Sequence, residues 1–219
     1  MTAVETLLLP QIPICGRVLD LCCGTGRLAA ELAQRRYRVV GLDSSGGMLS
    51  LARRRSGGVP WIRADARNFA LRSCFDAATC LFDSVNHLTS LEDLLATFAA
   101  VRDCLRPGGL FLFDVNTEQG FRERWVQEWQ VATVDGECRL AGAYDSEQRM
   151  GTYHFTLRGR GPESWRRAEF DLRERCHSDG EIRGALTEAG FSLVEVCDAV
   201  QDLEMDEEVG RDFYLVRRC

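Results

Sequence analysis

The chain has 219 residues, 45% hydrophobic and 27% charged, which is enough for one large domain and too apolar for general disorder. Its 27 basic and 33 acidic residues leave a formal net charge of −6, so no overall basic field attracts nucleic-acid backbones or anionic lipids. Every basic residue is arginine, which excludes chemistry that needs a Schiff-base lysine or a P-loop lysine.

The sequence contains no signal for export or membrane insertion. No apolar run approaches the roughly 20 residues that cross a bilayer, and residues 1–10 lack the regions of a signal peptide. The ten cysteines show no CxxC spacing, which favours reduced thiols in apolar segments over disulfides or zinc ligands. Three scattered histidines likewise predict no metal site. We therefore expect a cytoplasmic protein without a bound metal.

Up to Val115 the sequence alternates between short apolar runs and helical patterns. This alternation predicts an α/β fold, a doubly wound, mostly parallel sheet covered by helices on both faces. The predicted strands are Arg17–Cys22, Arg38–Leu42, Trp61–Ala64, Phe75–Phe82 and Leu110–Val115, and the predicted helices are Arg27–Arg36, Gly47–Arg54 and Ser90–Leu105.

The last of these helices carries end signals. Thr89 and Glu92 have the spacing of a capping box, which places the helix start beside them. Pro107-Gly108-Gly109 is expected to stop the helix, because proline and glycine cannot continue it.

After Val115 the pattern changes to a period of two. Asp135-Gly136 is a hairpin turn signal, and it predicts an antiparallel sheet. Ordinary βα patterns return at a second capping box, Ser178 with Glu181, in a helix that Gly190 ends. The predicted elements are a helix Glu118–Trp129 and strands Val131–Val134, Cys138–Leu140, Gly151–Leu157, Ala168–Arg173, Phe191–Val196 and Asp212–Arg217.

These patterns predict a core of residues 1–115 and 178–219, interrupted by an inserted antiparallel sheet. The insertion, residues 116–177, falls between the fifth and sixth strands of the core. Loops and insertions positioned by a rigid scaffold commonly carry specificity, so we expect it to form a lid on the substrate side.

The most informative stretch is an apolar strand that runs through Asp20 into Gly24-Thr25-Gly26 and then a helix. Glycines allow a ligand to approach the backbone, and a helix N-terminus offers free N–H groups. The next strand ends in Asp43, where a carboxylate can accept both hydroxyls of a ribose. The ordered pair of features in one βαβ unit predicts a nucleotide-type cofactor rather than a plain tight turn.

Here the sequence resembles the class I S-adenosylmethionine-dependent methyltransferases. Asp20-x-x-x-Gly24-x-Gly26 is similar to their first motif, Asp43 to their ribose-binding acid, and Asp65-Ala66 to the pair that meets the adenine. The resemblance implies a Rossmann-like sheet of seven strands whose last strand is antiparallel, with S-adenosyl-L-methionine as cofactor. The cofactor-binding residues it implies are Asp20, Cys22, Gly24, Thr25, Gly26, Asp43, Ser44, Met48, Asp65, Ala66 and Leu81.

Two other functions remain open on the sequence. Gly24-Thr25-Gly26-Arg27-Leu28-Ala29 also satisfies the GxGxxA pattern of enzymes that bind nicotinamide or flavin dinucleotides. Asp20 and Cys22 before the glycines, and two closing strands after a single helix, favour the methyltransferase over such an oxidoreductase. The third hypothesis is a non-catalytic subunit that binds the cofactor without turnover.

Methyl transfer is a displacement that asks little of the protein beyond positioning the acceptor and removing one proton. The candidate catalytic residues are Asp83 and His87, in a segment just beyond the fourth strand, because ligands bind outside the carboxyl ends of parallel strands. His87 accepts a proton near neutral pH in its ordinary state. The alternative is that Asn86 and His87 only brace the helix that starts at Ser90.

The insertion adds an architectural resemblance to methyltransferases of amino sugars and of glycine, in which an extra sheet roofs the acceptor. It implies a small-molecule acceptor, with an amine of a specialised metabolite slightly favoured. Trp125 and Trp129, one helical turn apart in the predicted helix, are usually core but could form a wall of the acceptor pocket. Few residues precede the first strand, so closure of the site by a partner in a homodimer stays open.

Overall fold

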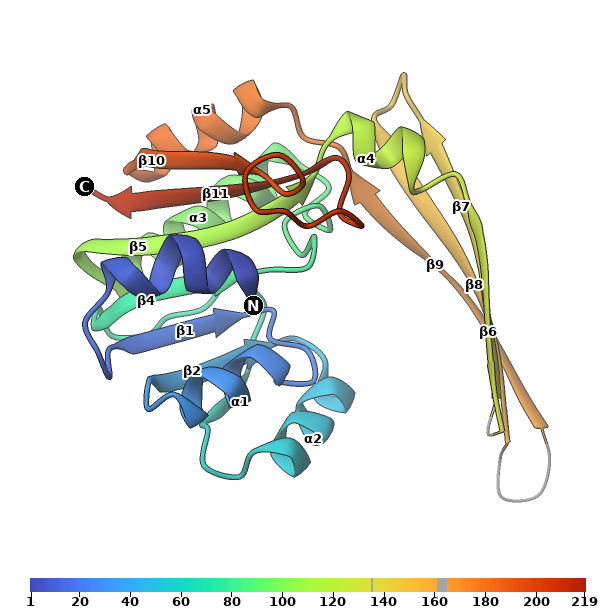
Figure 1. Ribbon diagram of the computed structural model, residues 1–219, viewed down its shortest axis with the longest axis horizontal. Helices are drawn as coiled ribbons and strands as arrows, with labels where there is room; N and C mark the ends of the chain where they lie inside the picture. The colour runs from blue at the N-terminus through green and yellow to red at the C-terminus, as the bar shows by residue number, and fades with distance from the viewer. Residues whose placement is uncertain (135, 161–164) are drawn as a thin grey trace.

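The two patterns of the sequence fold into two separate sheets (Figure 1). The computed structural model describes residues 1–134, 136–160 and 165–219. The first sheet has seven strands in the order β10-β11-β5-β4-β1-β2-β3. Its strands are β1 (Arg17–Leu21), β2 (Arg38–Asp43), β3 (Trp61–Arg63), β4 (Phe75–Cys80), β5 (Leu105–Asn116), β10 (Phe191–Asp198) and β11 (Arg211–Arg218).

Helices cover both faces of this sheet, as predicted. Apolar residues of α3 and α5 pack on one face, and those of the N-terminal η1 and η2 and of α1 pack on the other. Strand β11 runs antiparallel to both β5 and β10, and the other pairs are parallel. The fold is therefore the expected seven-stranded Rossmann-like sheet with its last strand reversed. The helices are η1 (Val4–Leu8), η2 (Leu9–Gln11), α1 (Arg27–Gln34), α2 (Gly46–Arg55), α3 (Leu91–Cys104), α4 (Glu118–Glu123) and α5 (Asp179–Ala189).

The apolar composition of the central strands explains why they occupy the middle of the sheet. All six residues of β4 are buried. Phe98 of α3 packs on Phe113 of β5 with ring centroids 5.2 Å apart, and Phe113 stacks on Tyr214 of β11 at 5.1 Å. Aromatic pairs at these distances add to the stability gained from burial.

Strands β1 and β4 end earlier than the sequence indicated. Cys22, Phe82 and Asp83 adopt left-handed backbone conformations, with φ of 55°, 60° and 53°. A left-handed residue breaks the ladder, so β1 stops at Leu21 and β4 at Cys80. Both loops turn away at the carboxyl edge of the sheet.

The N-terminal cap of α3 lies one residue later than predicted. Ser90, not Thr89, is the cap, and its hydroxyl accepts the N–H of Asp93 at 3.0 Å. Starting the helix at Leu91 places Leu94 and Phe98 in the core, and this packing fixes the phase. Residues 107–109 do not end α3, because it stops at Cys104 and β5 already includes them.

The cap of α5 follows the prediction. The Ser178 hydroxyl accepts the Glu181 N–H, and the Glu181 carboxylate accepts the Ser178 N–H at 2.8 Å. Gly190 closes the helix with φ of 85°, a conformation that glycine adopts without strain.

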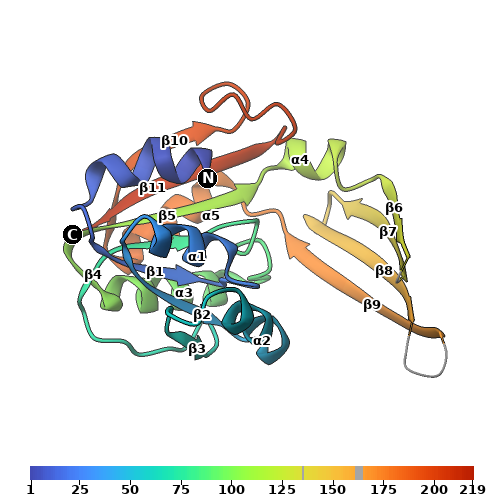
Figure 2. The ribbon, with the colours of Figure 1, turned by 60° about the horizontal axis from the view of Figure 1, so that its bottom comes forward.

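The insertion forms a four-stranded antiparallel sheet that extends away from the core (Figures 1 and 2). The predicted helix Glu118–Trp129 is shorter, because α4 ends at Glu123 and Trp129 pairs with Leu140 in a strand. Asp135 of the predicted hairpin turn lies outside the described residues. The strands are β6 (Glu128–Thr133), β7 (Gly136–Asp145), β8 (Met150–Arg160) and β9 (Trp165–Arg175).

A small aromatic cluster joins α4 and the residues after it to the inserted sheet. Phe121 and Trp125 pack on Tyr144 and Tyr153, with the rings of Trp125 and Tyr153 only 3.7 Å apart. The cluster holds the base of the sheet beside the carboxyl edge of the core. In the described ranges, no helix has both the length and the apolar character to span a bilayer.

Candidate functional site

Two adjoining pockets lie along the carboxyl edge of the core sheet, where the loops after β1 to β4 meet. The larger encloses about 610 Å³ and reaches the insertion at Leu172, and the smaller encloses about 270 Å³. Cys22, Gly24 and Ser84 line both. The larger pocket holds the predicted residues Cys22, Gly24, Asp43, Ser44, Met48, Asp65, Ala66 and His87, and the smaller holds Asp20, Cys22, Gly24, Thr25 and Leu81.

Asp43 is fixed at the end of β2 by two backbone donors. Its Oδ2 accepts the N–H of Gly24 at 2.8 Å, and its Oδ1 accepts the N–H of Ser45 at 2.8 Å. Each carboxylate oxygen accepts about two hydrogen bonds, so both oxygens keep a lone pair for a ligand. The half-buried carboxylate is thus held in a geometry that can receive two neighbouring hydroxyls.

The two glycines of the loop after β1 have different roles. Gly24 has φ of 53°, and a Cβ added there would meet no atom within 4 Å, so the space above it is open to a ligand. Gly26 has φ of 72°, and its added Cβ would lie 2.3 Å from the ring of Trp61. Gly26 is therefore a packing position of helix and strand, and it lines neither pocket. Its assignment to the cofactor stays a prediction.

Asp20 is a buried acid beneath the glycine loop. Its Oδ1 accepts the hydroxyl of Thr79 at 3.0 Å, and only 3% of the residue is exposed. Burial raises the pKa of Asp20 to about 7, against the hydrogen bond from Thr79. A carboxyl that ionises near neutral pH responds to a positively charged ligand in the adjoining pocket, because the cation favours its charged form.

Asp65 is already engaged by an arginine. Arg67 donates its Nη2 to Oδ2 at 2.7 Å and its Nε to Oδ1 at 3.0 Å, and these hydrogen bonds lower the pKa of Asp65 to about 2. Arg67 also reaches Asp93 at 3.2 Å. Asp65 and Ala66 line the larger pocket. A ligand that donates a hydrogen bond to Asp65 therefore shares the carboxylate with Arg67.

Of the two predicted catalytic residues, His87 lines the larger pocket and Asp83 lines neither pocket. Asp83 donates its N–H to Oδ2 of Asp114 at 2.9 Å, and its Oδ1 accepts Nη2 of Arg211 at 3.2 Å. The His87 ring is 43% exposed and lies 3.4 Å from the Arg173 carbonyl and 3.4 Å from Glu174. His87 therefore contacts the insertion and does not cap α3.

Glu174 is a buried acid beside the predicted catalytic residues, and no sequence pattern pointed to it. It is 3% exposed, lies between Asp83 and His87, and accepts Nδ2 of Asn116 at 3.3 Å. Burial, followed by the charge of and the hydrogen bond with Asp83, raises its pKa to about 10, so it is a neutral acid at pH 7. The sequence does not mark Glu174 as buried, because it stands between Arg173 and Arg175 in a strand, and such a run of charged residues is typical of a solvent-exposed face.

Asn86 links three elements of this junction. Its amide donates to the Asn116 carbonyl at 3.2 Å and to the Arg175 carbonyl at 2.9 Å, and its Oδ1 accepts the Asn116 N–H at 2.8 Å. The alternative in which Asn86 braces the start of α3 is therefore wrong. Its hydrogen bonds tie the loop after β4 to the ends of β5 and β9.

The other histidines and tryptophans lie outside the pockets. His154 contacts Asp171 at 2.7 Å on the polar face of the insertion. His177 is buried, and its Nε2 contacts the Leu88 carbonyl at 2.7 Å. Trp125 is buried and Trp129 is 53% exposed in β6, so the two tryptophans do not form one helical wall.

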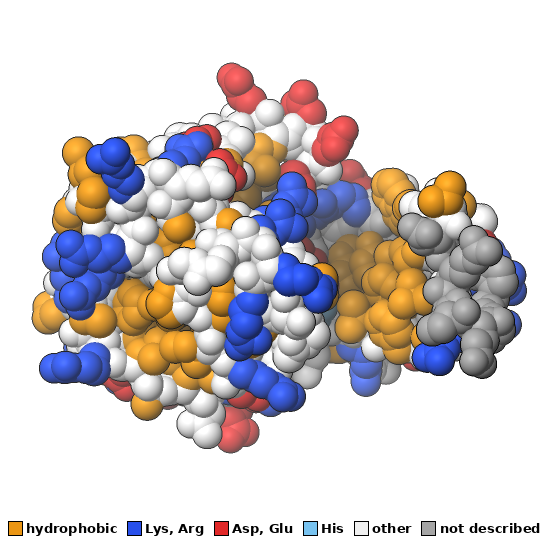
Figure 3. All heavy atoms as spheres, turned by 90° about the horizontal axis from the view of Figure 1, so that it is seen from below, with side chains coloured by type: hydrophobic (Ala, Val, Ile, Leu, Met, Phe, Trp, Pro, Cys, Tyr) orange, Lys and Arg blue, Asp and Glu red, His pale blue; other side chains and the backbone are white. Residues whose placement is uncertain are grey.

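The insertion presents an apolar face beside the larger pocket. Period-two alternation places Phe155, Phe170 and Leu172 on one side, and the rings of Phe155 and Phe170 stack at 4.9 Å. Phe170 is 42% and Leu172 39% exposed. Figure 3 shows apolar side chains gathered on the insertion beside the groove that separates it from the core. This face can supply a wall for a ligand with an apolar body.

The donor set fits a nucleoside cofactor with a positively charged centre. Open space above Gly24, the fixed carboxylate of Asp43 and the acid of Asp20 occur along one continuous edge. Carboxylates suit ribose hydroxyls and a cation, whereas their negative charge disfavours a phosphate beside them. The residues therefore match a sulfonium nucleoside better than a dinucleotide, whose pyrophosphate needs anion-binding donors.

Comparisons with known proteins agree with this site. A family described as a methyltransferase domain matches residues 18–109. The chain is 28% identical over 196 residues to dTDP-3-amino-3,4,6-trideoxy-alpha-D-glucopyranose N,N-dimethyltransferase from Streptomyces venezuelae, covering 87% of this chain and 81% of that protein.

Solved structures share the whole architecture. An S-adenosylmethionine-dependent methyltransferase from Clostridium acetobutylicum ATCC 824 has a TM-score of 0.83 at 23% identity, covering 99% of this chain and 89% of that one. CalS10 from Micromonospora echinaspora, an amino pentose methyltransferase solved with SAM bound, has a TM-score of 0.74 at 25% identity, covering 96% and 85%. The inserted sheet is therefore within the matched length of both.

Proposed function

We propose that this chain, which belongs to the S-adenosylmethionine-dependent methyltransferase family, transfers a methyl group to an amine nitrogen of a small molecule. One observation carries the proposal. The pockets at the carboxyl edge bring the glycine loop, the acid at the end of β2 and the loop after β4 together with the inserted sheet. The relatives named for amino-sugar substrates support an amine acceptor.

The donor side of the site is assigned to the residues of β1, β2 and β3. Asp43 accepts the ribose hydroxyls, Ser44 and Met48 flank the same pocket, and Asp65 with Ala66 faces the adenine. The remaining cofactor contacts, in the smaller pocket and its rim, are Asp20, Cys22, Gly24, Thr25 and Leu81. S-adenosylmethionine supplies the methyl group on a positively charged sulfur, which is the leaving group of the reaction.

The acceptor side is assigned to the loop after β4 and to the insertion. His87 and Asp83 are the candidate proton acceptors, because the reacting nitrogen must lose a proton for each methyl group it gains. Glu174, a neutral acid at pH 7, contacts both His87 and Asp83 and positions their side chains. The apolar face with Phe170 and Leu172 forms the acceptor wall, which makes residues 116–177 a lid on the substrate side.

Holding the nitrogen in line with the methyl group supplies most of the acceleration in such a displacement. The rigid sheet edge and the hydrogen-bonded loop of Asn86 provide that positioning. We further propose that the enzyme works in the cytoplasm, where the cysteines of the described chain stay free. We also propose a homodimer, which size-exclusion chromatography with light scattering tests.

A matched pair of acceptors tests the proposed function. The protein is incubated with S-adenosylmethionine and either dTDP-3-amino-3,4,6-trideoxyglucose or its 3-hydroxy counterpart, and S-adenosylhomocysteine and methylated product are measured by mass spectrometry. We expect transfer to the amine only, and none with Asp43→Ala. Transfer to the hydroxyl compound at the same rate contradicts the amine assignment. Tight binding of S-adenosylhomocysteine without turnover of any amine in a panel indicates a non-catalytic subunit, and binding of NADH instead indicates an oxidoreductase.

A further inference from the structure

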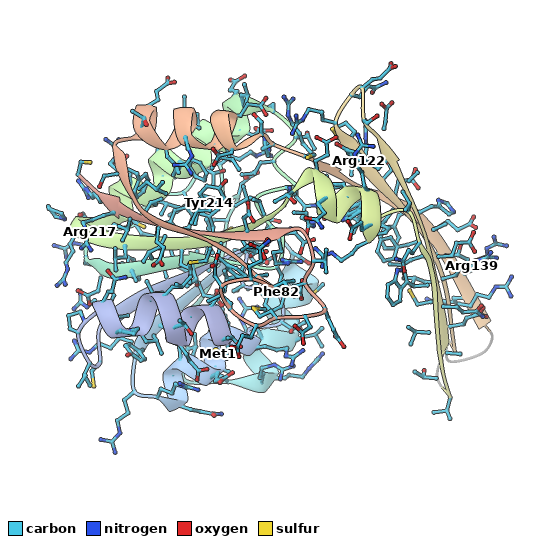
Figure 4. The ribbon with its side chains drawn as sticks, turned by 45° about the horizontal axis from the view of Figure 1, so that its top comes forward. Met1, Phe82, Arg122, Arg139, Tyr214 and Arg217 are labelled. Carbon is cyan, nitrogen blue, oxygen red and sulfur yellow. The ribbon has the colours of Figure 1, made fainter. Side chains whose placement is uncertain are left out.

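A third cavity lies beside the donor pockets, on the face of the sheet that carries the N-terminal helix. It encloses about 230 Å³ between η1, α1, the loop after β4 and the segment between β10 and β11. Its walls are mostly apolar, and Met1 and Phe82 lie on neighbouring segments at its rim (Figure 4). The lining includes Val4, Leu28, Phe82, Met205, Phe213 and Asp114.

Asp114 of β5 brings an unpaired acceptor to this cavity. The residue is 0% exposed. Its Oδ2 accepts Nη1 of Arg211 and the N–H of Asp83, whereas its Oδ1 has no hydrogen-bond partner among the described residues. A buried polar atom without a hydrogen-bond partner destabilises the protein by about 1–3 kcal/mol. A ligand that donates a hydrogen bond to Oδ1 removes this penalty, which strengthens its binding.

The charges around Asp114 select the kind of ligand. Arg211 uses Nη1 on Asp114, Nη2 on Asp83 at 3.2 Å and Nε on Glu208 at 2.7 Å. Arg124 is also engaged, donating to Glu208 at 2.8 Å. Three carboxylates therefore face two guanidinium groups, and one negative charge remains uncompensated. A cation complements this arrangement, because each guanidinium nitrogen of Arg211 already donates to a carboxylate.

We propose that this cavity is the subsite that receives the acceptor as its ammonium ion, which donates an N–H to Oδ1 of Asp114. The nitrogen then loses that proton to one of the candidate proton acceptors, which frees its lone pair to attack the methyl group. That the bound amine is the acceptor rests on the proposed function. The subsite itself is defined by the cavity and by the unpaired Oδ1 of Asp114. The ligand class is a protonated primary or secondary amine on a compact, largely apolar body, because the walls offer few other polar partners.

The position of the cavity suits an acceptor. It shares Arg27, Leu28, Leu81 and Phe82 with the smaller donor pocket, so an amine bound there lies next to the methyl donor. Phe82 is 73% exposed and left-handed, a combination typical of functional loops. The α-ammonium group of the methionine moiety is another cation in the neighbouring pocket, and the experiment below separates the two.

Binding depends on pH through the carboxyl of Asp114. Burial raises its pKa to about 6, and the charge of Asp83 raises it further while Arg211 opposes. The charged or titratable groups that face it are Cys80 of β4, Asp83 and Arg211, and Arg27, Glu31 and Glu208 also line the cavity. Asp114 is charged above about pH 6, so ammonium binding is retained there and lost as the pH falls through that value.

The test uses probes that need no turnover. Binding of cyclohexylamine and of the matched alcohol cyclohexanol to the full chain is followed by ligand-observed NMR, with and without S-adenosylhomocysteine, at pH 7.5 and pH 5. We expect cyclohexylamine to bind at pH 7.5 and cyclohexanol to bind at least about tenfold more weakly, because a charge-assisted hydrogen bond contributes more than a neutral one. Cyclohexylamine binding should fall at pH 5.

Two variants and a control locate the probe. Asp114→Asn keeps an oxygen for Arg211, and we expect it to weaken cyclohexylamine binding at least about tenfold without changing S-adenosylhomocysteine affinity. Ala3→Leu narrows the cavity from the N-terminal segment and should exclude the probe. Asp171→Asn, on the far face of the insertion, should change neither.

Three outcomes overturn the subsite. Equal binding of cyclohexylamine and cyclohexanol contradicts recognition of the positive charge. Absence of cyclohexylamine binding contradicts the subsite itself. Loss of S-adenosylhomocysteine affinity in Asp114→Asn, with probe binding kept, assigns Asp114 to the methionine moiety instead. If the amine binds as expected while no amine is methylated, the subsite stands and only the proposed function fails.

Discussion

The backbone N–H of Gly24 donates a 2.8 Å hydrogen bond to Oδ2 of Asp43, which joins the loop after β1 to the end of β2. The two residues are 19 positions apart in the chain and belong to adjacent parallel strands. The bond aligns the carboxylate with the open space above Gly24. Substitution of Gly24 or Asp43 should therefore weaken binding of the methyl donor more than it destabilises the fold.

Asp43→Ala should weaken S-adenosylhomocysteine binding by roughly 2–4 kcal/mol, because it removes two charge-assisted hydrogen bonds to the ribose. Isothermal titration calorimetry measures the change, with Asp171→Ala as an exposed control. Asp65→Asn should lose less, since Arg67 already engages that carboxylate. Unchanged affinity in a folded Asp43→Ala protein contradicts the ribose assignment.

Gly24→Ala and Gly26→Ala form a matched pair with opposite expectations. Both glycines have positive φ, so alanine is strained at either position by roughly 1–2 kcal/mol. At Gly26 the added Cβ also collides with Trp61, and we expect the larger loss of free energy of unfolding there. At Gly24 the Cβ enters the ligand space, and the larger loss of S-adenosylhomocysteine affinity relative to stability should appear there. Urea unfolding and calorimetry on both variants compare the two effects, and equal profiles argue against separate roles.

Asp20 should make the stability of the protein without cofactor depend on pH. Its pKa is raised from 3.8 to about 7 in the fold, so between these values the native state holds a proton that the unfolded chain has released. The free energy of unfolding therefore decreases as the pH rises through this range, by up to about 1.4 kcal/mol per pH unit. Asp20→Asn removes the part of this decrease that Asp20 contributes, while Asp114 and Glu174, whose pKa values are also raised, keep theirs. The variant should therefore gain stability relative to the wild type between pH 4.5 and pH 8. Urea unfolding of both proteins at pH 4.5 and pH 8 measures this. An equal difference in free energy of unfolding between variant and wild type at the two pH values contradicts the raised pKa of Asp20.

His87→Gln should lower kcat by about 10²-fold or more if the imidazole accepts the proton of the acceptor, and should leave S-adenosylhomocysteine affinity nearly unchanged. The ring is exposed and held only by two contacts of 3.4 Å, so little stability is expected to be lost. Steady-state kinetics and thermal unfolding separate the two effects. A variant that loses thermal stability but keeps its specific activity shows a bracing role.

Replacing Val131–Glu169 with a short Gly/Ser linker should keep some S-adenosylhomocysteine affinity and abolish transfer to the acceptor. The segment contains most of the inserted sheet, and the residues assigned to the donor lie outside it. Closing a loop of a different length changes the free energy by only about 0.6 kcal/mol per doubling. Calorimetry and the acceptor assay test the split. A folded deletion variant with wild-type transfer shows that the insertion is not needed for the acceptor.

The sequence alone determined the class of fold and the elements that we assign to the methyl donor. Strand and helix alternation, the glycine loop after Asp20 and the acid Asp43 are local patterns, and parallel βα units bring their carboxyl ends to one edge whatever the details of packing. The resemblance placed Asp65 and Ala66 at that edge too, where the structure has them. The capping box of Ser178 was equally readable, because its spacing is local.

Only the tertiary structure decided where elements end and which distant side chains meet. Ser90 caps α3 instead of Thr89 because core packing sets the phase of the helix, and Trp129 joins a strand because β7 pairs with it. Gly26 faces Trp61 from another strand. Glu174 and the orphan oxygen of Asp114 gain their chemistry from burial beside Asp83 and Arg211. Burial and long-range pairing have no period in the sequence, so these groups emerge only when the chain is folded.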